Sequence, residues 1–291
     1  MELPQNTSLP FFAYGLFKPD ELAHARIELL LARPPVRSFA RGSLWIRDGL
    51  PLLKIEPNNR VAGYLLHFHA EKSQEAYQTI ADVEPDKQYR WEQTELDDLP
   101  GSVNVLVGRS PEKGSIHYEE PEWSGRYDPV FVNALPLVRD IAQAYADHRF
   151  QSAPPDVFDW ERMFRLQMAY LLLWSSIERY CSLRYGASLD PMKKVKLLGE
   201  EPVFGTSLRE VVSRKDRVYD SRDPSDHTIL DPQKPGPSAL YYYQVRSNLS
   251  HRGKGAWKDG EIVRQSLNEL LEIFGLMLQQ DFGFNAADRR A

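Results

Sequence analysis

Phe11-Phe-Ala-Tyr-Gly-Leu-Phe-Lys-Pro19 leads from a short aromatic run into a turn that contains Gly15, Lys18 and Pro19. Aromatic residues favour β-strands, and Pro19 followed by Asp20 is a typical helix start. The stretch therefore predicts a strand over residues 9–14 and a helix over residues 20–32. In the turn between them, backbone N–H groups can face an anion.

Further β-rich runs follow before residue 110. Short apolar and aromatic runs broken by Gly, Pro and Asn predict strands over residues 42–46, 61–68, 89–94 and 103–107. Residues 70–81 are predicted as a second helix. Together these elements predict a domain of mixed α and β structure.

The pattern changes after residue 110. Gly, Pro and acidic residues gather in residues 110–122, which marks a domain edge. Helical periodicity then predicts helices over residues 130–148, 160–185, 191–198, 207–212, 238–250 and 259–280, with a polar loop over 219–237 and no strand. The predicted fold class is α+β, with a mixed domain over residues 1–122 and an all-α domain over residues 123–291.

The composition is that of a globular protein. The 291 residues are 42% hydrophobic and 26% charged, which excludes disordered and collagen-like chains. With no apolar run of membrane-spanning length and no signal-peptide pattern, we expect a cytoplasmic protein without membrane contact. One cysteine and no Cys/His cluster of zinc spacing predict no disulfide, metal or other cofactor.

The net charge of −5 is unevenly distributed. Residues 1–155 hold 16 basic residues against 22 acidic ones, and the rest of the chain holds 20 against 19. The C-terminal half is therefore the better candidate for binding a polyanion.

A second group of residues, Glu84 followed by Tyr89 and Arg90, stands about 70 residues after the Tyr-Gly-Leu-Phe turn. With Gly42 and the strand over residues 61–64, this combination resembles the gamma-glutamylcyclotransferase-like family over about residues 9–110. The resemblance implies a small β-barrel with helices and a substrate site formed by Tyr14, Gly15, Leu16, Phe17 and Tyr89. It also implies that Glu84 is the proton shuttle that helps a gamma-glutamyl amine cyclise to 5-oxoproline. The alternative interpretation makes Glu84 a solvated residue at a helix end and Gly15 a turn glycine.

Near the C-terminus, Arg246-Ser-Asn-Leu-Ser-His251 falls on the penultimate predicted helix. In an all-α domain this motif resembles the HEPN superfamily of ribonucleases and RNA-binding domains, over about residues 130–291. A neutral His251 can take the proton from a 2'-hydroxyl group, and Arg246 can grip the phosphate oxygens. Asn248 is a candidate for orienting the histidine or the phosphate.

The spacing of Arg246 and His251 places them about 140° apart on one straight helix. Either the helix ends near Arg252-Gly253 and turns His251 inward, or two protomers bring their motif helices together. The HEPN resemblance implies a symmetric homodimer.

The leading hypothesis is a metal-independent endoribonuclease of the toxin or phage-defence kind, whose N-terminal domain binds or modifies a small molecule. Its partners are then RNA, a small molecule in the N-terminal pocket, a second copy of the chain and an antitoxin. One alternative is a gamma-glutamylamine-type cyclotransferase whose HEPN half serves dimerisation or RNA binding only. Another is a binding module without either activity. Basic residues that are candidates for lining an RNA groove are Arg214, Lys215, Arg217, Arg222, Arg252, Lys254 and Lys258.

Overall fold

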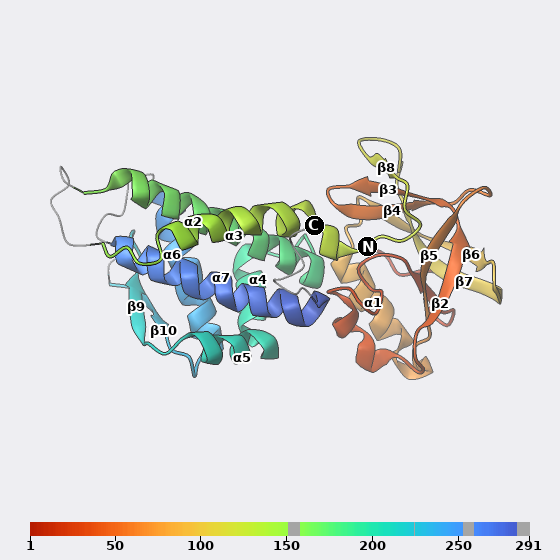
Figure 1. Cartoon of the computed structure of the whole chain (residues 1–291). Helices are drawn as coiled ribbons and strands as arrows, with labels where there is room; N and C mark the ends of the chain where they lie inside the picture. The colour runs from red at the N-terminus through yellow and green to blue at the C-terminus, as the bar shows by residue number, and fades with distance from the viewer. Residues whose placement is uncertain (151–157, 224, 253–258, 284–291) are drawn as a thin grey trace. The chain divides into compact units, whose positions relative to one another are not determined.

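The computed structural model describes residues 1–150, 158–223, 225–252 and 259–283, except for the side chains of residues 251 and 252. The chain divides into two compact units (Figure 1). The first comprises residues 1–128 together with residues 182–189, and the second comprises residues 129–181 and 190–291. Each unit is described separately.

The first unit is built on a closed five-stranded barrel. Its strands are β1 (Phe11–Ala13), β2 (Val36–Arg41), β5 (Arg60–Leu66), β6 (Tyr89–Leu96) and β7 (Leu99–Gly108), in the order β1-β5-β2-β6-β7. Neighbouring strands are antiparallel except β1 and β7, which pair in parallel and close the barrel. Apolar side chains such as Phe12, Ala40 and Val105 are fully buried. The predicted small β-barrel is therefore present near the N-terminus.

Smaller elements complete this unit. β3 (Ser43–Arg47), β4 (Leu50–Lys54) and β8 (Ile116–Tyr118) form a separate three-stranded sheet in the order β4-β3-β8. Helix α1 (Ser73–Val83) packs Tyr77 edge-to-face against Phe11 of β1 and Trp91 of β6. Helix α1 ends next to Glu84, because the following Pro85 disfavours a helical conformation at residue 84.

The predicted helix over residues 20–32 is wrong. Only short 3-10 turns form, at His24–Arg26 and Glu28–Leu30. The backbone bonds to other segments instead: Ala23 N–H donates to Leu16 O, and His69 N–H donates to Leu30 O. Contacts with the barrel therefore outweigh the local apolar periodicity.

The second unit consists mainly of helices. They are α2 (Leu135–Ala144), α3 (Trp160–Tyr185), α4 (Pro191–Glu200), α5 (Pro202–Val211), α6 (Pro235–Arg252) and α7 (Gly260–Phe282), with a π turn at Val130–Ala134 before α2. The last turn of α3 and the loop to residue 189 are grouped with the first unit. Helices α3 and α6 are joined by Tyr170, whose hydroxyl donates to Tyr242 O at 2.9 Å.

The prediction that no strand follows residue 122 is also wrong. β9 (Asp216–Tyr219) and β10 (His227–Leu230) form a two-stranded antiparallel sheet. Each strand has only four residues, and the sequence around them is rich in Asp and Pro, which are rare in strands. The sequence therefore predicts a loop here. The second unit is thus helical with one small hairpin, rather than all-α.

In the described parts of the chain, no helix combines the length and the hydropathy needed to cross a membrane.

Candidate functional site

The residues that were predicted to form the N-terminal site line one pocket of the first unit. Six of its lining residues are the predicted ones: Tyr14, Gly15, Leu16, Phe17, Glu84 and Tyr89. Phe11, Ala13, Pro51 and Leu106 complete the lining. The structure thus brings the turn after β1 and the end of α1 together, although they are about 70 residues apart in sequence.

The Tyr14–Phe17 turn lies close to strand β4. A Cβ atom on Gly15 would stand 3.1 Å from Cγ of Pro51, so glycine allows the turn to approach this strand closely. The turn itself is held by Lys18 N–H, which donates to Gly15 O at 3.1 Å. Pro51 contacts both Gly15 and Tyr89, because its carbonyl oxygen accepts a hydrogen bond from the Tyr89 hydroxyl at 2.8 Å.

Tyr14 is a fixed part of the pocket wall. Its hydroxyl donates to Leu106 O at 2.6 Å and accepts from Leu53 N–H at 3.1 Å. Burial, together with the nearby Glu84 carboxyl, raises the pKa of Tyr14 far above its usual range. The hydroxyl therefore stays protonated at any physiological pH.

Glu84 is the acidic group of the pocket. It is 8% exposed, and its Oε2 is buried without a hydrogen-bond partner among the described residues. No basic side chain lines the pocket, so burial acts alone and raises the pKa of Glu84 to about 8. Glu84 is therefore not the solvated helix-end residue of the alternative interpretation.

The pocket also offers hydrogen-bond donors. Within the described part of the chain, the backbone N–H groups of Leu16 and Phe17 have no acceptor. Hydrogen-bond donors and a carboxyl that can exchange a proton are the two components that acyl transfer needs. The enclosed space is only about 10 Å³, room for one water molecule.

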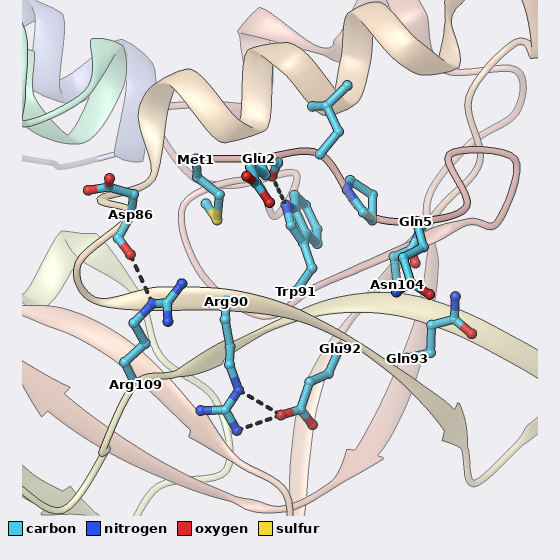
Figure 2. A pocket seen from close by; sticks show the side chains of 12 residues that line it. Met1, Glu2, Gln5, Asp86, Arg90, Trp91, Glu92, Gln93, Asn104 and Arg109 are labelled. Atoms are coloured by element: carbon cyan, nitrogen blue, oxygen red, sulfur yellow. Dashed lines mark hydrogen bonds and ion pairs between the residues drawn. The ribbon is translucent and has the colours of Figure 1, made fainter.

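Arg90, the last residue of the predicted group, does not reach this pocket. It is exposed on β6, and its Nε and Nη2 atoms donate to Oε1 of Glu92 at 2.9 and 2.5 Å. It lines a second, larger pocket (Figure 2). Sequence reasoning missed Arg109, whose Nε donates to Asp86 O and Tyr89 O and so fixes the turn after Glu84. A single arginine after a strand belongs to no sequence pattern that would predict its hydrogen bonds to this turn.

In the second unit, Arg246 lies on α6 and pairs with Glu178 of α3, with Nη2 to Oε1 at 3.1 Å. Its guanidinium carbon lies 5.6 Å from the centre of the Tyr243 ring, and 27% of the side chain is exposed. Glu178 was not predicted, because no local pattern connects residues on two separate helices.

Asn248 has a structural contact that the sequence did not suggest. Its Nδ2 donates to Tyr219 O at 2.8 Å, and its Oδ1 accepts from Ser221 N–H at 3.1 Å and from Gln244 Nε2 at 2.9 Å. It is 8% exposed. Asn248 therefore joins α6 to the segment that follows β9.

His251 lies on the last turn of α6, and its side chain is outside the described part of the structure. Because α6 continues through Arg252, the helix does not end before His251. The helix ends at Arg252, as the first solution for the angular mismatch with Arg246 supposes, and the composite cleft of two protomers stays open beside it.

Of the four residues of the predicted RNA groove whose side chains are described, three are paired, and Arg217 is exposed on β9 without an ion pair in the described structure. Arg214 donates from Nε and Nη2 to Glu269 at 2.7 and 3.0 Å, Lys215 contacts Asp231 at 2.9 Å, and Arg222 contacts Asp220 at 3.4 Å. Lys254, Lys258 and the side chain of Arg252 lie outside the described residues. Much of the positive charge near β9 is therefore already neutralised.

Comparison with known proteins adds little to this geometry. No family model matches the chain, and no curated protein matches it significantly. Among solved structures, the chain is similar to the uncharacterized protein PH0828 from Pyrococcus horikoshii, with a TM-score of 0.32 and 12% identity, covering 49% of this chain and 100% of that chain. A likeness at this level defines neither a fold nor an activity.

Proposed function

We propose that the barrel pocket is the active site of a gamma-glutamylamine-type cyclotransferase in which Glu84 shuttles the proton. The observation that supports this most is the state of the Glu84 carboxyl, which is buried beside the Tyr14–Phe17 turn with its Oε2 unpartnered within the described structure. A carboxyl with a pKa of about 8 exchanges its proton readily near neutral pH. That property suits a group that acts first as base and then as acid.

The proposed reaction is an intramolecular acyl transfer. Glu84 removes a proton from the α-amine of the gamma-glutamyl group, and the nitrogen attacks the side-chain carbonyl carbon. The free N–H groups of Leu16 and Phe17 donate to the oxyanion that forms. The amide C–N bond then breaks, Glu84 returns the proton to the departing amine, and 5-oxoproline is released. Because the pocket has room for only one water molecule, it has to widen to admit substrate.

The test is formation of 5-oxoproline from gamma-glutamyl-n-butylamine, followed by mass spectrometry. We expect Glu84→Gln to reduce the rate at least about 100-fold, because glutamine cannot accept the proton. Glu75→Gln is the matched control, since Glu75 is exposed on the same helix. Turnover that survives in Glu84→Gln, or no turnover by the unmodified protein, would contradict the proposal.

A second function, metal-independent cleavage of RNA by the helical unit, is supported by a separate observation. Helix α6 carries a partly exposed Arg246, held by Glu178, and runs on through His251. A fixed guanidinium can bind phosphate oxygens while a neutral histidine activates a 2'-hydroxyl. In this proposal the helical unit is a HEPN-like bundle of the toxin or phage-defence kind, and the barrel senses or modifies a small molecule.

This second proposal is tested by incubating the purified protein with total RNA in EDTA and mapping the new 3' ends. We expect 2',3'-cyclic phosphate ends, lost in Arg246→Ala and in His251→Ala. Arg139→Ala serves as control, because Arg139 is exposed on α2. Cleavage that stops in EDTA, or that persists in His251→Ala, rules the motif out as the catalytic centre.

A further inference from the structure

A pocket of about 650 Å³ lies in the first unit, and none of its lining residues belongs to the Glu84 pocket. It is formed by the segment over residues 1–5, the turn after α1, and strands β6 and β7. In Figure 2, Asp86 and Arg109 lie at one end, Gln5, Gln93 and Asn104 at the other, and Trp91 between them. A volume of this size is typical of sites for small molecules.

The two arginines of this pocket differ in their electrostatic state. Arg90 is paired with Glu92, so its charge is compensated. Arg109 uses Nε to bind two backbone carbonyl oxygens, and its Nη1 and Nη2 atoms have no partner among the described residues. The planar guanidinium of Arg109 is thus the cation that remains available for a carboxylate.

Acidic groups limit which anions fit. Glu2 and Asp86 line the same pocket, and neither side chain has an ion-pair partner within the described structure. With Arg90 and Glu92 cancelling each other, these two carboxylates remain against the guanidinium of Arg109 and the amino group of Met1, which also lines the pocket. This balance disfavours a polyphosphate and favours a ligand with both a carboxylate and an amine.

The middle of the pocket offers an apolar surface. The indole N–H of Trp91 donates to Glu2 O at 2.9 Å, which fixes the ring between β6 and the N-terminal segment. At the far end, Asn104 is 1% exposed and its Oδ1 has no hydrogen-bond partner among the described residues.

We propose that this pocket binds a small zwitterion of the amino-acid or dipeptide class, with its carboxylate on Arg109, its amine facing Asp86 or Glu2, and its side chain on Trp91. The site is independent of cyclotransferase activity, because Glu84 takes no part in it. Trp91 also contacts Phe11 of the Glu84 pocket, with ring centres 5.7 Å apart. This aromatic pair forms the wall between the two pockets.

The test is isothermal titration of the full chain with glycyl-phenylalanine and with its C-terminal amide, which lacks the carboxylate. We expect the acid to bind with a Kd of about 1 mM or tighter, and the amide to bind at least about tenfold more weakly. Arg109→Met should weaken binding of the acid to the same degree. Arg37→Met is the control and should change it less than about twofold, because Arg37 lies on β2 and does not line the pocket.

Arg109→Met also removes the bonds from Nε to the turn after Glu84 and can disturb that turn. Arg109→Lys keeps the charge without the Nε bonds, and we expect it to retain more affinity than Arg109→Met. The comparison of acid with amide on the unmodified protein needs no variant. Absence of binding by the acid, equal affinity for acid and amide, or equal losses in the two arginine-to-methionine variants would overturn the proposal.

Discussion

Glu84 shows how the surroundings of one side chain decide its chemistry. The groups closest to it are aromatic rings, aliphatic side chains and the neutral Tyr14 hydroxyl, and no basic residue lines the pocket. Burial without a compensating charge favours the protonated form, which is why the pKa of Glu84 rises to about 8. The burial that raises this pKa also makes the ionised form of Glu84 destabilising to the fold.

This cost gives a prediction about stability. In the folded protein Glu84 keeps its proton up to about pH 8, whereas in the unfolded chain it loses the proton near the ordinary pKa of 4.5. The folded state therefore binds more protons between these pH values, and its stability falls as the pH rises from 4.5 to 8. Glu84→Gln cannot ionise and escapes this loss.

We expect Glu84→Gln to be about as stable as the unmodified protein near pH 4.5 and more stable near pH 8, by at most about 5 kcal/mol. Thermal unfolding of both proteins at the two pH values measures the difference. A gap between their melting temperatures that does not grow with pH would show that Glu84 is ionised in the fold.

Tyr14 allows a second prediction at this scale. Tyr14→Phe leaves Leu106 O without its donor and Leu53 N–H without its acceptor, both in the buried pocket wall. Because unsatisfied buried groups are costly, we expect a loss of about 1–3 kcal/mol in the free energy of unfolding. Urea denaturation measures it, with Tyr127→Phe as control because Tyr127 is 66% exposed. Equal effects of the two substitutions would contradict the role given to the Tyr14 hydroxyl.

Among the elements, α6 has the most varied contacts. One turn pairs Arg246 with α3, and the same region holds the segment after β9 through Asn248. The carboxamide of Asn248 suits this position because it donates to one backbone group and accepts from another. The β9–β10 hairpin is thereby tied to the helix that carries Arg246 and His251.

We expect Asn248→Ala to release this hairpin without unfolding the helices. Loss of the two backbone contacts should speed amide exchange in residues 216–230 at least about fivefold. Hydrogen exchange with mass spectrometry detects the change. Ser250→Ala is the control, since the exposed Ser250 bonds only to carbonyl groups of its own helix. Unchanged exchange in Asn248→Ala would mean that packing alone holds the hairpin.

The elements also show what a sequence can and cannot predict. The bounds of α3 were predicted in full because apolar residues recur at helical spacing through its 26 residues. β2 and β4 were missed, and residues 20–32 were assigned to a helix, because short segments are decided by partners far away in sequence. The pocket shows the same division: its motif residues were predicted from a family resemblance, while Pro51 and Leu106 enter only through strand pairing.

For the whole molecule, each proposed activity has its groups within one unit. The Glu84 pocket uses residues 11–106, and the Arg246 contact uses residues 178–246. The pairing of Arg214, Lys215 and Arg222 with carboxylates leaves Arg217 as the unpaired cation of the predicted groove among the side chains that the structure describes. A ribonuclease built on α6 would therefore need further groups beside Arg246 to hold RNA.

That requirement leads to a prediction about assembly. Since α6 continues through Arg252, Arg246 and His251 lie about 140° apart around the helix, and one face does not carry both. We expect a homodimer in which Arg246 of one protomer faces His251 of the other, detectable by light scattering at micromolar concentration.

Arg246→Ala and His251→Ala would each be inactive alone. A mixed dimer of the two variants would keep one intact cleft, so unfolding and refolding them together in equal amounts should restore about a quarter of the RNA cleavage, because random pairing makes half of the dimers mixed. If the refolded mixture stays as inactive as its parts, or if the protein is a monomer, the composite cleft is wrong and the two residues do not serve one phosphate.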